Sequence, residues 1–321
     1  MEYRRFGRTG LEVSVMGLGT GGPSQLGQGS GVPEAEAVRT VRRALELGVN
    51  LIDTAADYAE SEAILGRALA NAPRDSYVLC TKFNGVRNHR APAAGPEALK
   101  DAAEMAESLE RSLRRLGTDH VDLLQLHGVT PDWYDRVQDR FLPALRRLRQ
   151  QGKTRFLGIT ERFTDDPAHE SLTRALADGS YDAMMVGYNL LSPSAEEHVL
   201  PEARRRGVGV LIMFAVRRTL ARPELLEQLV AQLKASGELA ADALPDRGPL
   251  DRLLQGDVDS VPSAAYRFAA GHPGTSCVLS GTARVDHLEQ NVAAIQRGPL
   301  PAADREWVIR TFGPLRRSLG N

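Results

Sequence analysis

The sequence predicts an α/β protein, and within that class a (β/α)8 TIM barrel. Eight short apolar runs recur along the 321 residues, and amphipathic segments of helical length separate them. The runs are nearly continuous in Val, Leu, Ile and Met, which is typical of parallel strands buried on both faces. Strand then helix, eight times over, is the pattern of a barrel, and a barrel of this length is commonly one domain, here residues 1–321.

An N-terminal β-hairpin is expected before the barrel. The stretch "YRRFGRTGLEVS" (3–14) can turn at Gly7–Gly10 and plug one end of the barrel. The eight strands are predicted at 13–19, 50–54, 77–82, 121–127, 154–160, 183–189, 208–214 and 277–282.

The segments between the strands have the periodicity of helices. In 95–116, apolar residues from Leu99 to Leu116 repeat at intervals of three and four, with charged residues opposite, which gives one buried stripe. The segment 34–48 has the same pattern and ends at Gly48, a natural C-cap.

One connection is much longer than the others. Residues 215–260 follow the seventh strand and precede a helix near 261–272, and they contain a predicted helix at 223–235. A loop of this length in a compact fold is usually a functional lid or partly disordered.

Charge and cysteine content limit the classes of function. Forty basic and 41 acidic residues give a net charge of −1, which argues against a nucleic acid or an anionic membrane as partner. No apolar run is long enough to cross a bilayer, and "MEYRRFGRTG" does not resemble a secretory leader. Cys80 and Cys277 lie in strand-like runs and indicate no disulfide framework. We therefore expect a cytoplasmic protein with a small-molecule ligand.

Polar side chains end three successive predicted strands. Asp53 ends the second, Lys82 the third and His127 the fourth, and Tyr58 follows on the loop after Asp53. Active sites of such barrels lie at the carboxyl ends of the strands. A phenol has a pKa near 10, so it needs a nearby ammonium to stabilise phenolate, and the ammonium needs a carboxylate. Each residue alone suits a turn, a solvated surface or packing, but together they favour a catalytic site in which the imidazole contacts a substrate oxygen.

Other motifs give weaker hypotheses. "GLGTGG" (17–22) fits the dinucleotide pattern G-x-G-x-x-G, but no helix is predicted at Gly22, and Asp53 lies beyond the usual spacing of about 20 residues. No Tyr has a Lys four residues later, so the sequence has no catalytic Tyr–Lys pair one helical turn apart. The seven His residues form no metal-binding pair, so no metal site is expected.

These residues make the chain resemble the aldo-keto reductase family. The resemblance is carried by "YRRFGRTGLEVSVMGLGT", "NLIDTAADYAESE", "LLQLHG" and "SGTARVDHLEQN", in that order and over nearly the whole chain. It implies reduction of an aldehyde or ketone, or the reverse, with NADP(H) as the cofactor and NAD(H) as an alternative. Tyr58 would be the general acid, Lys82 and Asp53 would tune it, and His127 would orient the carbonyl oxygen of a carbonyl or sugar-like substrate.

The resemblance also implies cofactor contacts at the strand ends. Where the family commonly holds the nicotinamide amide with Ser-Asn and Gln, this chain has Thr160, Glu161 and Met185, and Met213 takes the place of a stacking aromatic. Arg284 is the one cation near the eighth strand that could bind a 2′-phosphate. The expected cofactor-binding residues are Gly19, Thr20, Asp53, Thr160, Glu161, Met185, Met213, Phe214, Ala215, Arg217, Gly281, Thr282, Arg284, His287, Gln290 and Asn291.

The sequence leaves two other functions open. The altered amide contacts also suit a nicotinamide-binding regulatory or interaction subunit with little turnover. A lyase or isomerase that uses hydride transfer transiently is the third hypothesis. Trp133 and Tyr134, shortly after His127, are candidate walls of the substrate pocket. No oligomeric state is predicted.

Overall fold

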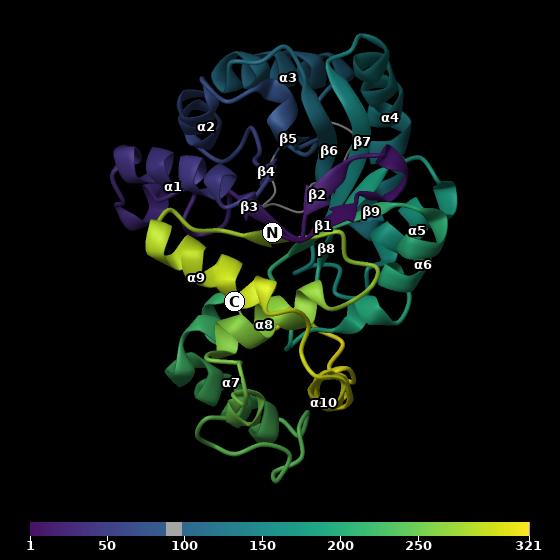
Figure 1. The fold of residues 1–321 in the computed structure, drawn as a ribbon. Helices are drawn as coiled ribbons and strands as arrows, with labels where there is room; N and C mark the ends of the chain where they lie inside the picture. Colours follow the sequence, from purple (N-terminus) through teal and green to yellow (C-terminus); the bar gives the residue numbers. More distant parts are fainter. Residues whose placement is uncertain (88–97, 321) are drawn as a thin grey trace.

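The computed structural model describes residues 1–87 and 98–320, and in this part of the chain eight parallel strands close into a barrel. Figure 1 shows the helices placed around the strands. The strands follow one another in chain order, and the last pairs with the first. They are β3 (Met16–Gly19), β4 (Leu51–Asp53), β5 (Val78–Phe83), β6 (Val121–Val129), β7 (Thr154–Glu161), β8 (Ala183–Gly187), β9 (Gly209–Met213) and β10 (Cys277–Ser280). Each overlaps its predicted run, so the predicted barrel is confirmed.

Helices connect the strands and cover the outside of the barrel (Figure 1). They are α1 (Glu34–Glu46), α2 (Ser61–Leu69), α3 (Ala102–Leu116), α4 (Tyr134–Gln150), α5 (Glu170–Asp178), α6 (Val199–Arg206), α7 (Pro223–Ala235), α8 (Val261–Ala270), α9 (Val285–Gln296) and α10 (Ala302–Phe312). The predicted helix in the long connection is confirmed as α7, which lies with the following segment in a lobe at one side of the barrel. None of the described helices is long and apolar enough to cross a membrane.

The predicted hairpin closes the amino-terminal end of the barrel. Strands β1 (Tyr3–Arg5) and β2 (Glu12–Ser14) pair antiparallel. Phe6 follows β1 and is fully buried against Gly209, where a Cβ would lie 2.5 Å from the Phe6 ring. The opposite, carboxyl end of the strands is therefore the end that remains for a ligand.

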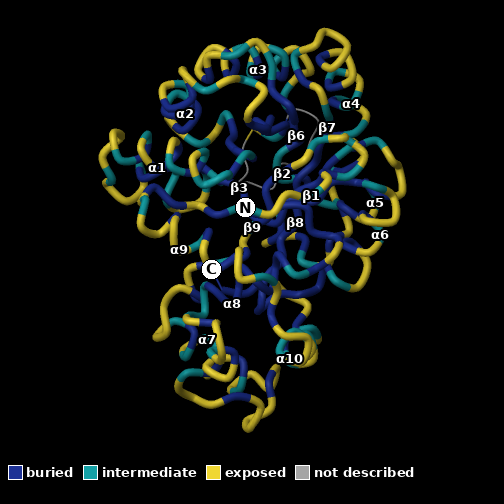
Figure 2. Tube along the Cα trace, viewed as in Figure 1, coloured by how far each residue is buried: buried dark blue, intermediate teal, exposed yellow. Residues whose placement is uncertain are grey.

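Two layers of apolar side chains form the core. One layer lies inside the barrel and includes Leu51, Cys80 and Leu123, and the other fills the space between strands and helices. Figure 2 shows the buried chain concentrated in the barrel and the exposed positions on the outer helices and the α7 lobe. Because side chains alternate along a strand, the residue two positions after Leu51, Asp53, also points into the barrel.

The third helix begins later than predicted. The periodicity placed its start at residue 95, but α3 begins at Ala102, and Leu99 instead forms an isolated β-bridge with Val86. The cause is a capping box, in which Asp101 caps the helix and the Glu104 side chain accepts from the Asp101 backbone N–H at 2.6 Å. Residues 95–97 of the predicted helix lie outside the described residues.

Helices α2 and α3 approach closely at Gly66. A Cβ at this position would lie 2.2 Å from the carbonyl oxygen of Arg115. We expect Gly66→Ala to destabilise the protein by about 1–3 kcal/mol in urea unfolding, because a backbone oxygen in a packed helix cannot move aside alone. Arg67→Ala, on the exposed face of the same helix, is the matched control and should change stability by less than about 0.5 kcal/mol. Equal stabilities for the two variants would contradict this packing.

Candidate active site

Four polar side chains meet at the carboxyl ends of three neighbouring strands. Asp53 is the last residue of β4, Lys82 lies one residue before the end of β5, and His127 lies near the end of β6. Tyr58 comes from the turn between β4 and α2. The structure therefore brings together the four residues that the sequence predicted to be catalytic.

Asp53 and Lys82 form a buried ion pair. Lys82 Nζ lies 2.6 Å from Asp53 Oδ2 and also donates to the carbonyl oxygen of Thr54 at 2.8 Å. Both side chains are almost fully excluded from solvent. Buried charges need both a close partner and further hydrogen bonds, and this pair has both. The ammonium is consequently held in one place.

Tyr58 stands between the ammonium and the imidazole. Lys82 Nζ donates to the Tyr58 hydroxyl at 3.4 Å and lies 4.9 Å from the centroid of its ring. The Tyr58 and His127 rings meet edge to face with centroids 5.7 Å apart. A Cβ at Gly21 would lie 2.4 Å from the Tyr58 ring, so only glycine leaves room for the phenol here. A carbonyl oxygen at the mouth would thus meet a phenol and an imidazole together.

Burial and the ion pair determine which groups carry charge. Burial raises the pKa of Tyr58, and the Lys82 charge opposes that rise. Burial likewise raises the pKa of Asp53, against the lowering effect of Lys82 and Gln125. Burial lowers the pKa of Lys82, but the charges of Asp53 and Tyr58 and the hydrogen bonds to them outweigh it, so this pKa lies above its ordinary value. At neutral pH, Tyr58 is therefore protonated and Lys82 is charged.

The sequence reasoning missed Gln125. This residue lies on β6 opposite Lys82 on β5, and its Nε2 donates to Asp53 Oδ1 at 3.2 Å. The signal was present in the sequence, because Gln125 precedes His127 by two residues and strand alternation places both on the inner face. A polar residue inside an otherwise apolar run at that spacing is a candidate partner for the site.

Several predicted cofactor residues lie around the same mouth. Gly19 ends β3 and Gly281 follows β10, and a Cβ on Gly281 would meet nothing closer than the Gly19 carbonyl oxygen at 3.7 Å. Thr20 is buried and donates through its hydroxyl to the Asp53 carbonyl oxygen at 3.1 Å. Phe214 follows β9 with 38% of its surface exposed. Bare backbone at two strand ends and an exposed aromatic ring after a third strand suit a flat ligand.

The predicted amide contacts have protein partners in this structure. The Glu161 carboxylate is buried, accepts from the Gly187 backbone N–H at 2.7 Å and lies 2.8 Å from His169 Nδ1. Thr160 Oγ1 accepts from a backbone N–H at 2.7 Å. Met185 is buried within the inner core layer. Their role toward a cofactor stays a prediction, and only Thr160 keeps a hydroxyl proton to offer.

Arg217, predicted to contact a cofactor, is held by the C-terminal tail. It is buried beside Ala215, and it donates to Ser318 Oγ at 2.6 Å and to the Leu319 carbonyl oxygen at 2.8 Å. Its guanidinium lies 4.5 Å from the centroid of the Phe214 ring. Burial lowers its pKa to about 10, so it remains a cation at neutral pH. The tail thus fixes a positive charge beside the exposed aromatic ring.

The residues after β10 are divided between surface and core. Arg284 pairs with Asp286 at 2.6 Å on the surface, and Thr282 Oγ1 accepts from the Arg284 backbone N–H at 3.1 Å. Asn291 donates to Ser280 Oγ at 2.9 Å. Two further predicted residues of this set are exposed, His287 and Gln290. The cation predicted for a 2′-phosphate therefore already has an acidic partner.

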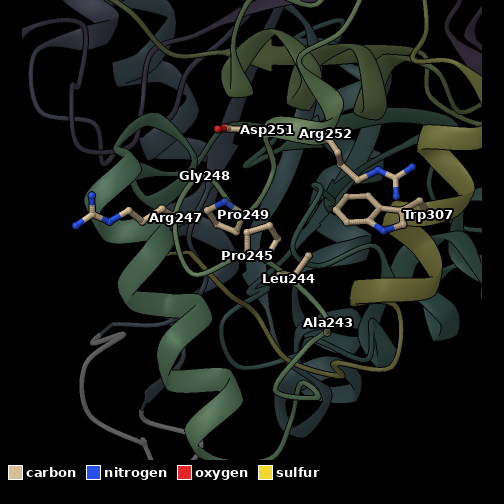
Figure 3. A pocket seen from close by; sticks show the side chains of 9 residues that line it. All are labelled: Ala243, Leu244, Pro245, Arg247, Gly248, Pro249, Asp251, Arg252 and Trp307. Carbon is tan, nitrogen blue, oxygen red and sulfur yellow. The ribbon is translucent and has the colours of Figure 1, made fainter.

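Two other features lie away from the four central residues. Tyr134, a candidate pocket wall, is buried and donates to Asp178 at 2.6 Å, so it belongs to the core, whereas Trp133 is half-buried. A hollow of about 360 Å³ lies between the segment after α7 and helix α10. Figure 3 shows the side chains that line it. Its walls are Ala243, Leu244, Pro245, Arg247, Gly248, Pro249, Asp251, Arg252 and Trp307. None of these is a candidate catalytic residue.

The chain is an α/β-barrel protein in which a phenol, an ammonium and a carboxylate meet at the carboxyl end of the strands. The chain belongs to the aldo/keto reductase family, whose model matches residues 15–307. This confirms the resemblance found in the sequence.

Relatives of known name agree with this assignment. The chain is 30% identical over 305 residues to L-galactose dehydrogenase of Arabidopsis thaliana, covering 92% of this chain and 88% of that protein. Among solved structures, the holo form of aldo-keto reductase AKR11C1 from Bacillus halodurans matches with a TM-score of 0.71 and 28% identity, over 97% of this chain and 96% of that one. An aldo/keto reductase from Klebsiella pneumoniae in complex with NADP and acetate has the same fold, with a TM-score of 0.68 and 24% identity, over 99% and 98% of the two chains.

Proposed function

We propose that this protein is an NADP(H)-dependent oxidoreductase that reduces an aldehyde or ketone to an alcohol, or catalyses the reverse reaction, with Tyr58 as the proton donor. The observation that carries the proposal is the continuous contact from Asp53 through Lys82 to the Tyr58 hydroxyl. A phenol is a weak acid on its own, and an ammonium beside it stabilises the phenolate that forms as its proton leaves.

Each residue has a distinct part in this reaction. Tyr58 gives its proton to the carbonyl oxygen, and Lys82 stabilises the phenolate. Asp53 keeps Lys82 charged and aimed, because the pair is buried where a lone ammonium would lose its proton. His127, with its ring against Tyr58, orients the carbonyl oxygen. When bound, the reduced nicotinamide supplies the hydride for the carbonyl carbon.

The mouth of the barrel fits a nicotinamide dinucleotide. Gly19 and Gly281 present bare backbone, and Phe214 presents an exposed ring with the Arg217 cation beside it. The Klebsiella pneumoniae structure holds NADP in the same fold, which supports this choice of cofactor. NAD(H) is the alternative, because Arg284 pairs with Asp286 and offers a weakened charge to a 2′-phosphate.

For the substrate we propose a sugar-like carbonyl or hydroxyl compound. The support is the name of the Arabidopsis thaliana relative, L-galactose dehydrogenase. We place the reaction in the cytoplasm, because both cysteines are free and buried among apolar side chains, as suits a reducing compartment.

The test combines binding with turnover. Titration with NADPH and NADH, followed by fluorescence, measures which cofactor binds. Oxidation of NADPH over a panel of aldehydes and ketones, and reduction of NADP⁺ and NAD⁺ with aldose sugars, measures turnover in each direction. We expect submillimolar binding of at least one cofactor and turnover of at least one compound. A protein that binds neither cofactor would refute the proposal.

A second candidate is a nicotinamide-binding subunit with little turnover. It is favoured by Glu161, whose carboxylate is already engaged by His169 and Gly187 and offers little to the carboxamide. The same experiment separates the two functions. Tight cofactor binding without turnover of any compound in the panel, together with a protein partner in co-purification, would support the subunit over the enzyme.

A further inference from the structure

The Asp53 carboxylate has a second anchor besides Lys82. Lys82 Nζ donates to Oδ2, and Gln125 Nε2 donates to Oδ1 at 3.2 Å. Gln125 and Lys82 are register partners on neighbouring strands, and Gln125 has no exposed surface. The two carboxylate oxygens are thus divided between one charged and one neutral donor.

Gln125 lowers the stability of the fold. Its Oε1 is buried and has no hydrogen-bond partner among the described residues. A buried polar atom without a partner is destabilising, so its presence calls for an explanation. The next strand also makes room for the side chain, because a Cβ at Gly158 would lie 2.7 Å from Gln125 Cγ. An apolar side chain of the same size would avoid the unsatisfied oxygen.

We infer that Gln125 is a positioning residue, which holds Asp53 so that only one carboxylate oxygen faces Lys82 and the ammonium stays directed at Tyr58. This inference rests on the proposed function of Tyr58. A neutral donor suits the task, because it anchors Oδ1 without adding a charge that would compete for Lys82. Without it, both oxygens of Asp53 could turn to the ammonium and draw it away from the phenol.

The other groups around Asp53 do not replace this anchor. Burial raises the pKa of Cys80 and of Cys277, so both thiols stay neutral, and the hydrogen bond from Gln125 lowers the pKa of Asp53. The titratable groups that face Asp53 are Lys82 and Cys80 on β5, Cys277 on β10 and Tyr58, with His127 on β6 beyond the Tyr58 ring.

The test is Gln125→Met, which keeps the volume and removes the donor. In protein with ¹³C-labelled tyrosine, the resonance of the Tyr58 ring is identified by its loss in Tyr58→Phe and followed as the pH is lowered. Protonation of Asp53 changes that resonance. Because the lost hydrogen bond stabilised the charged carboxylate, we expect the inflection to move to higher pH by about one pH unit. The low-pH limb of kcat should move in the same direction, with the NADPH dissociation constant unchanged.

The control is Leu123→Met, two residues earlier on the same inner face of β6. It alters packing without touching the carboxylate and should leave both pH profiles as in the wild type. The inference would be overturned if the Tyr58 resonance of Gln125→Met had its inflection at the same pH as that of the wild type. It would also be overturned if neither protein showed an inflection. The resonance needs no substrate. A failure of the proposed function would instead appear as absent turnover in the wild type.

Discussion

Replacing Tyr58 by Phe is expected to lower kcat by about 10²–10⁴-fold, the range that a positioned general acid contributes. The substitution removes only the hydroxyl to which Lys82 donates at 3.4 Å. The ring keeps its packing against Gly21 and His127. Affinity for NADPH and unfolding stability should therefore remain close to those of the wild type. Steady-state kinetics on the best compound of the panel, with cofactor titration, measures both.

The matched control is Tyr3→Phe. Tyr3 is 47% exposed in the N-terminal hairpin, and its hydroxyl donates to the Gly48 carbonyl oxygen. Loss of that hydroxyl should leave kcat unchanged. Turnover by Tyr58→Phe at the level of this control would show that another group supplies the proton.

The pKa of Tyr58 also predicts the pH dependence of reduction. Burial raises this pKa above its ordinary value near 10, so the donor form persists through the neutral range. From neutral pH upward, reduction should therefore stay nearly constant at first and fall in alkaline solution as the phenol loses its proton. The reverse reaction needs phenolate as the base and should rise over the same alkaline range. Initial rates in both directions, measured from neutral to alkaline pH, check this expectation.

The central residues could be predicted because residue type and strand position agreed. Asp53, Lys82 and His127 each lie at or near the end of a strand, and a closed parallel barrel necessarily brings the carboxyl ends of its strands together. Tyr58 lies on a short loop after β4, so it also reaches this end of the barrel. Local sequence and global topology therefore led to the same four residues.

Gln125 was missed although its spacing from His127 indicated it, and the partner of Glu161 could be identified only in the structure. Gln125 lies inside a strand, and the candidate residues were chosen from the ends of strands. Glu161 meets His169, which adopts a left-handed backbone with φ of 59° where α5 begins. A sequence pattern does not show that the chain folds back there. Periodicity alone likewise assigned Leu99 to a helix, although the Asp101–Glu104 capping box marked the true start.

Replacing Lys82 by Met is expected to abolish turnover and to destabilise the fold by about 3–5 kcal/mol at neutral pH, as when one partner of a buried ion pair is removed. Asp53 would be left as a buried carboxylate whose pKa burial raises, without the Lys82 charge that now opposes the rise. A raised pKa in the folded state favours the protonated form. The variant therefore loses stability as the pH rises above the pKa of Asp53 in the unfolded chain, which is near 4, and regains stability as the pH falls. Urea unfolding of Lys82→Met at pH 5 and pH 8 should show the smaller loss at pH 5.

The double variant Asp53→Asn/Lys82→Met separates stability from catalysis. The asparagine side chain is neutral and nearly the same shape as the carboxylate, so no uncompensated charge remains in the barrel. Most of the stability lost in Lys82→Met should return, because the penalty was electrostatic. Turnover should not return, since nothing then stabilises the Tyr58 phenolate. If the double variant were as unstable as Lys82→Met, the loss would come from packing around the Lys82 side chain. If it regained turnover, the ion pair would have no part in the chemistry, and Tyr58 would act as a donor without the ammonium that lies 3.4 Å from its hydroxyl.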